Sequence, residues 1–178
     1  WSSDVCSSDL EADPALAKEH ARSGATRKTA KDHFFPEIAH HMYEGDTALH
    51  MAAAAYREQI VADLIARGAD VRAKNRRGAE PLHYGSDGTS ESPIWNPRAQ
   101  AATIAQLIAA GADPNAVNND GVTPLHRAVR TRCASAVRAL LDGGADVRGA
   151  NRSGSTPLSL ATQNTGRGGS GSAEAKAQ

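Results

Sequence analysis

The stretch that decides the fold is Gly121–Asp146, GVTPLHRAVRTRCASAVRALLDGGAD, which has the pattern of one complete helix–turn–helix unit. Thr123 is a favoured N-cap residue, and Pro124 suits the first helical position, where the missing N–H would have been unpaired. A second helix is predicted by apolar residues at helical spacing, such as Val137 and Leu141. The two glycines that follow can adopt the left-handed conformation with which helices commonly end.

The same unit occurs repeatedly along the chain at a nearly constant spacing. Its opening glycines are Gly45, Gly78, Gly121 and Gly154, so two steps are 33 residues long and the middle step is 43. A fixed period in this range, with matching residues in matching positions, is typical of a solenoid. The residues of the repeated motif are Thr47, Leu49, His50, Pro81, Leu82, His83, Thr123, Pro124, Leu125, His126, Thr156, Pro157 and Leu158.

These motifs resemble the ankyrin repeat. The resemblance rests on the TPLH-like openings, the paired LI or LL, and the sequence GAD followed by Asn75, Asn118 or Asn151, and it covers Gly45 to about Ala161. It implies an all-α solenoid of stacked antiparallel helix pairs, with finger loops that project at about right angles to the helices. Two loop insertions are expected to interrupt this regular architecture.

The repeat period also predicts how the chain is divided. We expect residues 11–44 to be a partial N-terminal repeat or an insertion, with a short helix from Pro14 as an alternative. The extra residues of the second repeat are expected near 85–99, as a loop between its two helices, because the segment is rich in Gly, Ser and Pro. Full repeats are expected at 45–77, 78–120 and 121–153, followed by a partial repeat with a Gly/Ser-rich linker at 154–178.

The first ten residues, WSSDVCSSDL, are similar to the in-frame translation of a common short-read sequencing adapter, so we exclude them from fold reasoning. We expect the chain to be a fragment cut at both ends. Without Asp4 and Asp9, 20 basic residues face 18 acidic ones. Without Cys6, Cys133 is alone and forms no intramolecular disulfide. A small hydrophobic role for Cys133 and an intracellular, cytoplasmic location are therefore expected, rather than a nucleophile or a secreted protein.

The histidines could suggest a metal site. His50, His83 and His126 occupy the same motif position, but successive helices pack roughly 10 Å apart, too far to share a zinc ion with ligands at about 2 Å. The resemblance instead implies that each one bonds the backbone of the next repeat. The adjacent His40 and His41 have no Cys or carboxylate at metal-ligand spacing. We expect no metal and no cofactor.

Nothing in the sequence indicates an enzyme, since no nucleophile, base and orienting residue recur together. The resemblance implies a non-enzymatic, monomeric module that binds an unidentified protein through its concave face, finger loops and insertions. The candidates are variable finger and helix-end positions, together with aromatic residues of the insertions. They are Arg76, Arg77, Asn119, Asp120, Arg130, Thr131, Arg152, Ser153, Trp95, Phe34 and Phe35.

Other functions remain open at this point. Basic finger residues, among them Arg72, Lys74 and Arg152, could hold a nucleic acid or a phosphate ligand, although the formal net charge of zero argues against it. The chain could also be the regulatory portion of a larger enzyme. No apolar run is long enough to span a bilayer, so no membrane is expected. Trp95 has two open interpretations, an exposed partner anchor and a shield for the second repeat.

Overall fold

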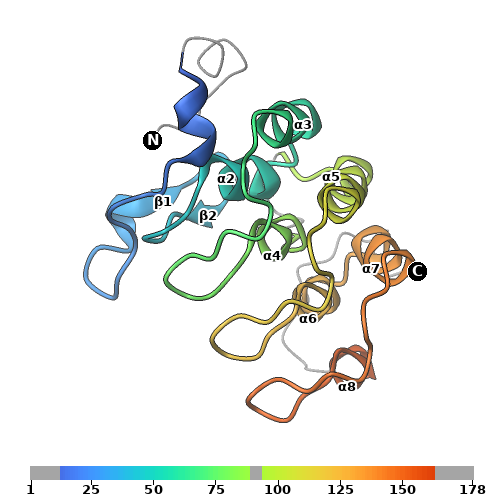
Figure 1. Cartoon of the computed structure of the whole chain (residues 1–178). Coiled ribbons are helices and arrows are strands. Elements are labelled where there is room, and N and C mark those ends of the chain that lie inside the picture. Colours follow the sequence, from blue (N-terminus) through green and yellow to red (C-terminus); the bar gives the residue numbers. More distant parts are fainter. Residues whose placement is uncertain (1–12, 89–93, 163–178) are drawn as a thin grey trace.

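The computed structural model describes residues 13–88 and 94–162 and shows a solenoid of stacked helix pairs (Figure 1). The expectations for residues 1–10 and for the Gly/Ser-rich linker lie outside the described residues. In chain order the elements are η1 (Pro14–Lys18), η2 (Lys31–His33), β1 (Phe34–Phe35), β2 (His40–His41), α2 (Ala48–Ala54), α3 (Glu58–Ala66), α4 (Pro81–Gly85), α5 (Pro97–Ala109), α6 (Pro124–Arg130), α7 (Ala134–Asp142) and α8 (Pro157–Thr162).

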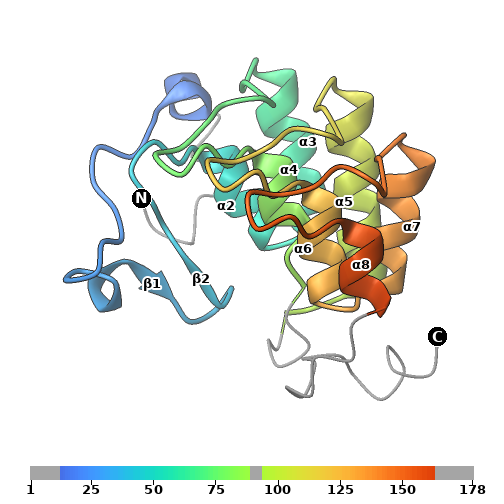
Figure 2. The ribbon, with the colours of Figure 1, turned by 90° about the horizontal axis from the view of Figure 1, so that it is seen from below.

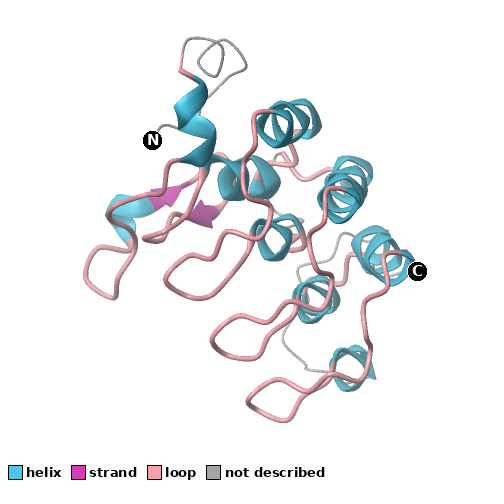
Figure 3. Cartoon of the chain, in the orientation of Figure 1, coloured by secondary structure: helices cyan, strands magenta, loops and turns pink. Residues whose placement is uncertain are grey.

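The helices form two rows. Helices α2, α4, α6 and α8 make an inner row beside the finger loops, and α3, α5 and α7 make an outer row behind it (Figure 1). Within each repeat the two helices pack against each other, and each helix also packs on its counterpart in the next repeat. The loops project sideways from the helices on one side of the stack (Figure 3). The predicted all-α solenoid is therefore confirmed.

Each inner helix begins at the repeated TPLH-like motif. Thr123 caps α6, because its Oγ1 accepts a hydrogen bond from the backbone N–H of His126 at 3.3 Å. The N–H of Thr123 in turn donates to Nδ1 of His126 at 3.2 Å. Since a backbone N–H can only donate, Nδ1 must be unprotonated and Nε2 carries the proton. Nε2 can then donate to the carbonyl of Ser155, 2.9 Å away in the next repeat.

The other two motif histidines make the same link between repeats. Nε2 of His50 lies 3.1 Å from the Ala79 carbonyl, and Nε2 of His83 lies 3.0 Å from the Val122 carbonyl. Both imidazoles are fully buried. Burial lowers the pKa of His50, and it lowers the pKa of His83 to about 3 with help from the nearby charge of Arg127. The rings are therefore neutral donors that join one layer to the next.

The fingers are built by an asparagine at the same position in each repeat. Oδ1 of Asn118 accepts the N–H groups of Asp120 and Val122, both at 2.9 Å, and this closes the turn. Gly121 at the tip has φ +71°, a conformation that favours glycine. An added Cβ there would lie 3.1 Å from the backbone nitrogen of Arg152. Glycine therefore lets one finger lie close against the next.

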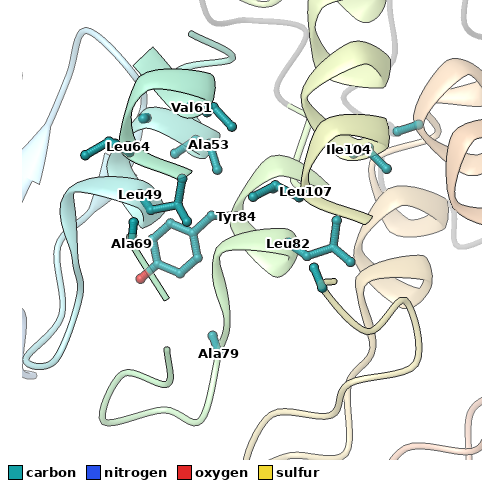
Figure 4. Packing of buried hydrophobic residues seen from close by; sticks show 14 of the residues in the cluster. Leu49, Ala53, Val61, Leu64, Ala69, Ala79, Leu82, Tyr84, Ile104 and Leu107 are labelled. Atoms are coloured by element: carbon teal, nitrogen blue, oxygen red, sulfur yellow. The ribbon is translucent and has the colours of Figure 1, made fainter. Parts of the chain in front are cut away.

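The core lies between the two rows and is thin and rich in alanine (Figure 4). Leu82, Ile104 and Leu107 are completely buried where α4 and α5 meet, and Leu140 is completely buried on α7. Alanines fill the remaining space, so neighbouring helices approach closely. The core runs along the length of the stack as one cluster.

The N-terminal insertion, residues 24–43, leaves the solenoid and returns to the same place. Gly24 approaches so closely that an added Cβ would lie 2.3 Å from the backbone nitrogen of Glu44. Its middle forms the antiparallel pair of β1 and β2, in which Phe34 faces His41 and Phe35 faces His40. Figure 2 shows this hairpin at one end of the stack, beside α2. The sequence analysis did not predict these strands, which are too short to give a periodic signal.

The second insertion follows α4, which has five residues where α2 and α6 have seven. The outer helix α5 begins at Pro97, and the side chain of Asn96 caps it by accepting the N–H groups of Arg98 and Ala99. Residues 89–93 of the expected loop lie outside the described residues. No helix in the described ranges is long and apolar enough to cross a bilayer.

Candidate functional site

A groove of about 290 Å³ lies between the N-terminal insertion and the concave side of the solenoid. We call it the hairpin groove. One wall is the insertion, the other is a pair of fingers, and the floor is made by α4, α6 and the residues that follow α4. The polar and aromatic side chains that line the groove include His40, His41 and Tyr43 from the insertion, Arg77, Asn118 and Asp120 from the fingers, and Tyr84, Asp87, Arg127 and Arg130 from the floor.

The floor of the groove is organised by Asp87. Its carboxylate accepts a hydrogen bond from the guanidinium of Arg127 and a longer one, at 3.3 Å, from Arg130. Its backbone carbonyl accepts a hydrogen bond from the hydroxyl of Tyr56 in the previous repeat. Burial acts to raise the pKa of Asp87, but the nearby Arg127, His40 and Arg130 outweigh it and lower that pKa. Asp87 is therefore a carboxylate whose negative charge Arg127 already neutralises.

The insertion contacts the floor through aromatic rings. The ring of His40 packs against the ring of Tyr84 in a tilted arrangement, with their centroids 4.3 Å apart and their planes at 50°. His50 meets the same tyrosine ring edge-on, and the guanidinium carbon of Arg127 lies 5.9 Å from its centroid. Burial lowers the pKa of His40 to about 4, although the charge of Asp87 acts in the opposite direction. A neutral imidazole therefore packs on Tyr84 at neutral pH.

Tyr84 is held in place by a buried polar cluster. Its hydroxyl donates to Asp46 Oδ2 at 2.8 Å and accepts from Nδ2 of Asn75 at 2.9 Å. The same carboxylate accepts the backbone N–H of Tyr43, at the end of the insertion, at 2.6 Å. Burial and the charge of Asp46 raise the pKa of the Tyr84 hydroxyl. The cluster therefore fixes the end of the insertion, the first finger and α4 relative to one another.

The first finger supplies the positively charged wall. Arg77 donates to the hydroxyl of Tyr43 at 3.2 Å, and its guanidinium carbon lies 5.1 Å from the centroid of that ring. It also lies 4.0 Å from Asp120 on the next finger, in a pair whose side chains are about half exposed. The neighbouring Arg76 donates instead to the carbonyl of Ala25, inside the insertion. One finger thus holds the insertion with Arg76 and faces the groove with Arg77.

The structure brings only some of the sequence candidates together. Arg77, Asp120 and Arg130 line the hairpin groove. Asn119 lies on the finger, where its side chain donates to the carbonyl of Arg76 at 3.0 Å. Thr131 lies behind the groove, where its hydroxyl accepts the N–H of Gly88.

The remaining candidates lie elsewhere. Arg152 and Ser153 are exposed on the last finger, outside the lining of the groove. Phe34 is exposed and packs on His41, and Phe35 is half-buried.

Trp95 does not have the fully exposed position that a partner anchor requires. It is half-buried and packs against the core. Its indole N–H donates to Oε1 of the buried Gln100 at 3.1 Å, and the thiol of Cys133 bonds the same oxygen. This environment supports the interpretation in which Trp95 shields the second repeat. The buried Cys133 has a raised pKa because of its burial, so its thiol is protonated and unreactive at neutral pH.

Several groove residues were not identified from the sequence. His40, Tyr43, Tyr84, Asp87 and Arg127 come from three different parts of the chain, and no motif connects them. One signal was available for Tyr84, an aromatic residue at a position where other repeats carry the smaller Met51 or Arg127. The insertion folds back so that His40 contacts Tyr84, and no pattern in the sequence near either residue predicts this contact.

The groove combines a paired, buried floor with a few accessible charged groups at its walls. The parts of the chain that the structure describes contain no group of three or more His, Cys, Asp or Glu side chains placed to hold a metal ion. The titratable side chains of the floor are engaged with one another, as with Asp87 and Arg127 or Tyr84 and Asp46. The accessible groups are the guanidiniums of Arg77 and Arg130 and the carboxylate of Asp120.

Comparison with known families supports the same view of the repeats. Residues 44–76 match the family model described as "Ankyrin repeat", and residues 107–161 match the model described as "Ankyrin repeats (many copies)". No curated protein matches the chain. The first match corresponds to the first full repeat, and the second begins in the outer helix α5 of the second repeat and covers the third repeat.

Proposed function

The chain is an ankyrin repeat protein, and from this premise we propose that it binds a protein partner at the hairpin groove and the adjoining fingers. Ankyrin repeats are generally protein–protein interaction modules and are typically non-enzymatic. The observation that carries the proposal is the groove itself, where insertion, fingers and inner helices meet around exposed Arg77 and Arg130.

The charges on the fingers favour a protein over a nucleic acid. Arg72 lies 3.7 Å from Asp113, and Lys74 lies 3.8 Å from Glu80. Arg77 is near Asp120, and Arg76 is engaged with the insertion. A surface that binds the phosphate backbone of a nucleic acid needs positive charge that is not paired with acidic side chains. On these fingers, basic side chains lie next to acidic ones. This mixed surface suits a partner that carries both kinds of charge.

The proposal is tested by site-specific photo-crosslinking in extracts of the source organism. A benzoylphenylalanine residue is placed at Asn119 on a finger beside the groove, or at the exposed Arg138 on outer helix α7 as the control. We expect a discrete crosslinked protein from position 119 and none from position 138. A partner that crosslinks only from position 138 would move the binding site to the outer helices.

A further inference from the structure

We propose that the hairpin groove recognises an acidic side chain of the partner, an Asp or Glu, seated between Arg77 and Arg130. This inference rests on the proposed function and specifies the chemistry of the segment that binds. The supporting observations are the charge balance of the lining, the accessibility of its two outer arginines and the size of the hollow.

The lining carries one more positive than negative group. Its guanidiniums are Arg77, Arg127 and Arg130, and its carboxylates are Asp87 and Asp120. Arg127 is only 13% exposed and bonds Asp87, itself 18% exposed, so these two charges cancel inside the floor. His40 is neutral at neutral pH, because its pKa is lowered. The balance of the groove is therefore one positive charge, which one carboxylate would neutralise.

Arg130 can accept a new partner. Its side chain is 66% exposed, and its guanidinium makes a 3.3 Å contact with Asp87, whose charge Arg127 already satisfies. A guanidinium has five N–H donors in a fixed fork that matches a carboxylate. Arg130 therefore offers unused donors at the mouth of the groove.

Arg77 is the second available donor, on the opposite wall. Its side chain is 50% exposed, and its separation of 4.0 Å from the 62% exposed Asp120 is that of a weak surface pair. Such exposed pairs contribute little to stability, so a better-placed carboxylate can replace Asp120. Tyr43 holds the guanidinium of Arg77 from the insertion side, because its hydroxyl accepts one N–H at 3.2 Å and its ring lies 5.1 Å from the guanidinium carbon.

Size and charge together favour a carboxylate over a phosphate group. The volume of about 290 Å³ is near the lower end of ligand pockets, which run from roughly 300 Å³, so it suits one side chain and its neighbours. A dianionic phosphate would exceed the single positive charge of the lining and would face Asp87 and Asp120. A single Asp or Glu on an extended segment fits the volume of the groove and carries the one negative charge that its lining can neutralise.

The test begins with a library of random peptides displayed on phage and selected against the whole chain. We expect the selected peptides to share an Asp or Glu, and the change of that residue to Asn or Gln to weaken binding at least about 10-fold, as expected for hydrogen bonds to a charged group. Affinity is measured by fluorescence polarisation of the labelled peptide. Arg77→Gln and Arg130→Gln should each cause a similar loss, whereas Arg138→Gln on the outer row is the matched control and should not.

Charge reversal makes the test specific to the groove. Arg130→Glu should abolish binding of the acidic peptide, and a peptide with Lys in place of its acidic residue should bind this variant better than it binds the original chain. The melting temperature of each variant is measured alongside, because Arg130 also contacts Asp87 and Arg77 also contacts Tyr43. Better binding of the Lys peptide by Arg130→Glu requires a folded variant, so unfolding does not explain that result.

The outcomes separate this inference from the proposed function. One contrary result is that the selected peptides crosslink to benzoylphenylalanine at position 119 and yet need no acidic residue. Another is that they bind both arginine variants as well as the original chain. Either result would overturn the recognition of an acidic side chain and leave the proposed binding face in place. A selection in which no peptide crosslinks from position 119 would count against both.

Discussion

Glu80 is the side chain that departs most from the repeat pattern, because it stands where Thr47, Thr123 and Thr156 stand in the other copies. Its carboxylate is fully buried and faces the backbone of His83 in a capping-box arrangement, but neither oxygen comes within hydrogen-bond distance and geometry of a partner among the described residues. Lys74 approaches to 3.8 Å with a side chain that is about half exposed. Burial raises the pKa of Glu80, although the charge of Lys74 opposes it. An ionised Glu80 therefore weakens the start of α4.

The first prediction is that Glu80→Thr stabilises the chain, because a threonine hydroxyl restores the N-cap found at Thr123. We expect the free energy of unfolding at pH 7 to rise by roughly 0.5–2 kcal/mol, measured by urea denaturation. Because the folded-state pKa of Glu80 is raised, its contribution is favourable at low pH and is lost as the pH rises through that pKa. The gain should therefore be larger at pH 7 than at pH 4. The exposed Glu19→Thr is the control, and an equal gain there would contradict the explanation.

The second prediction concerns the neutral histidines, since burial lowers the pKa of His40, His50 and His83. The unfolded state binds these protons near pH 6.5, while the folded state stays neutral to lower pH. Stability should therefore fall as the pH drops below 6.5, by up to about 1.4 kcal/mol per pH unit for each histidine. Urea unfolding at pH 7.5, 6.0 and 5.0 measures the slope. In the variant His40→Gln the free energy of unfolding should depend less steeply on pH, because one fewer proton binds on unfolding. A free energy of unfolding that does not change with pH in this range would contradict the assignment of neutral histidines.

At the scale of the elements, each outer helix has one completely buried leucine on its core-facing side. Leu107 on α5 and Leu140 on α7 are completely buried, while Leu141, next to Leu140, is 42% exposed. The two leucines are adjacent in sequence, but their side chains point in different directions around the helix axis. Only Leu140 therefore faces the core. The same sequence pair, LI or LL, occurs in every full repeat, and its first member is the one that points into the core.

The third prediction uses this pair. Leu140→Ala, and likewise Leu107→Ala, should lower the free energy of unfolding by roughly 2–5 kcal/mol, because each leaves a cavity between layers. Leu141→Ala should cost much less, since its side chain already contacts solvent. The measurement is the urea midpoint at constant slope. Equal losses for Leu140 and Leu141 would show that the register of α7 is wrong.

The fourth prediction concerns the second insertion. Trp95 packs against the core and bonds Gln100, so its emission should be blue-shifted and poorly quenched by acrylamide. The chain for this measurement carries Trp1→Phe, which leaves one tryptophan. Trp95→Ala should also lower the melting temperature. A freely quenched indole with the emission of solvated tryptophan would restore the interpretation of Trp95 as an exposed partner anchor.

At the scale of the whole molecule, the solenoid has two distinct long faces. One face is formed by α3, α5 and α7, and the other by the inner helices and the finger loops (Figures 1 and 2). The hairpin groove lies on the side of the inner helices and the fingers. The N-terminal insertion lies on the groove side, so it changes the shape of the concave face without entering the helical stack. Its basic neighbours on the fingers are paired with acidic side chains.

The fifth prediction follows from this pairing. The chain should shift labelled DNA or RNA only weakly at low salt, and the shift should vanish by about 0.15 M salt, because few phosphate contacts are available. A variant with alanine at Arg72, Lys74, Arg76 and Arg77 should differ little in a gel-shift titration. Nanomolar binding that persists at high salt would instead support the nucleic-acid alternative.

The sequence by itself determined the repeat and the paired helices within it. The cap at Thr123 and the left-handed turn at Gly121 depend on residues within a few positions, and the helical spacing of apolar residues such as Leu140 marks the buried side of each helix. These are local effects, and the repetition of each one at the same position makes the pattern unambiguous. The bridging bonds of His83 and His126 belong to the same pattern.

Only the tertiary structure decided the groove and the environment of the insertions. His40 meets Tyr84 across 44 positions of the chain, and Arg127 meets Asp87 across 40. Neither insertion repeats, so neither has a second copy against which its pattern could be compared. The burial of Trp95 likewise depends on Gln100 and the core behind it. Contacts of this kind are set by how distant segments fill shared space, and a single sequence does not encode them as a local pattern.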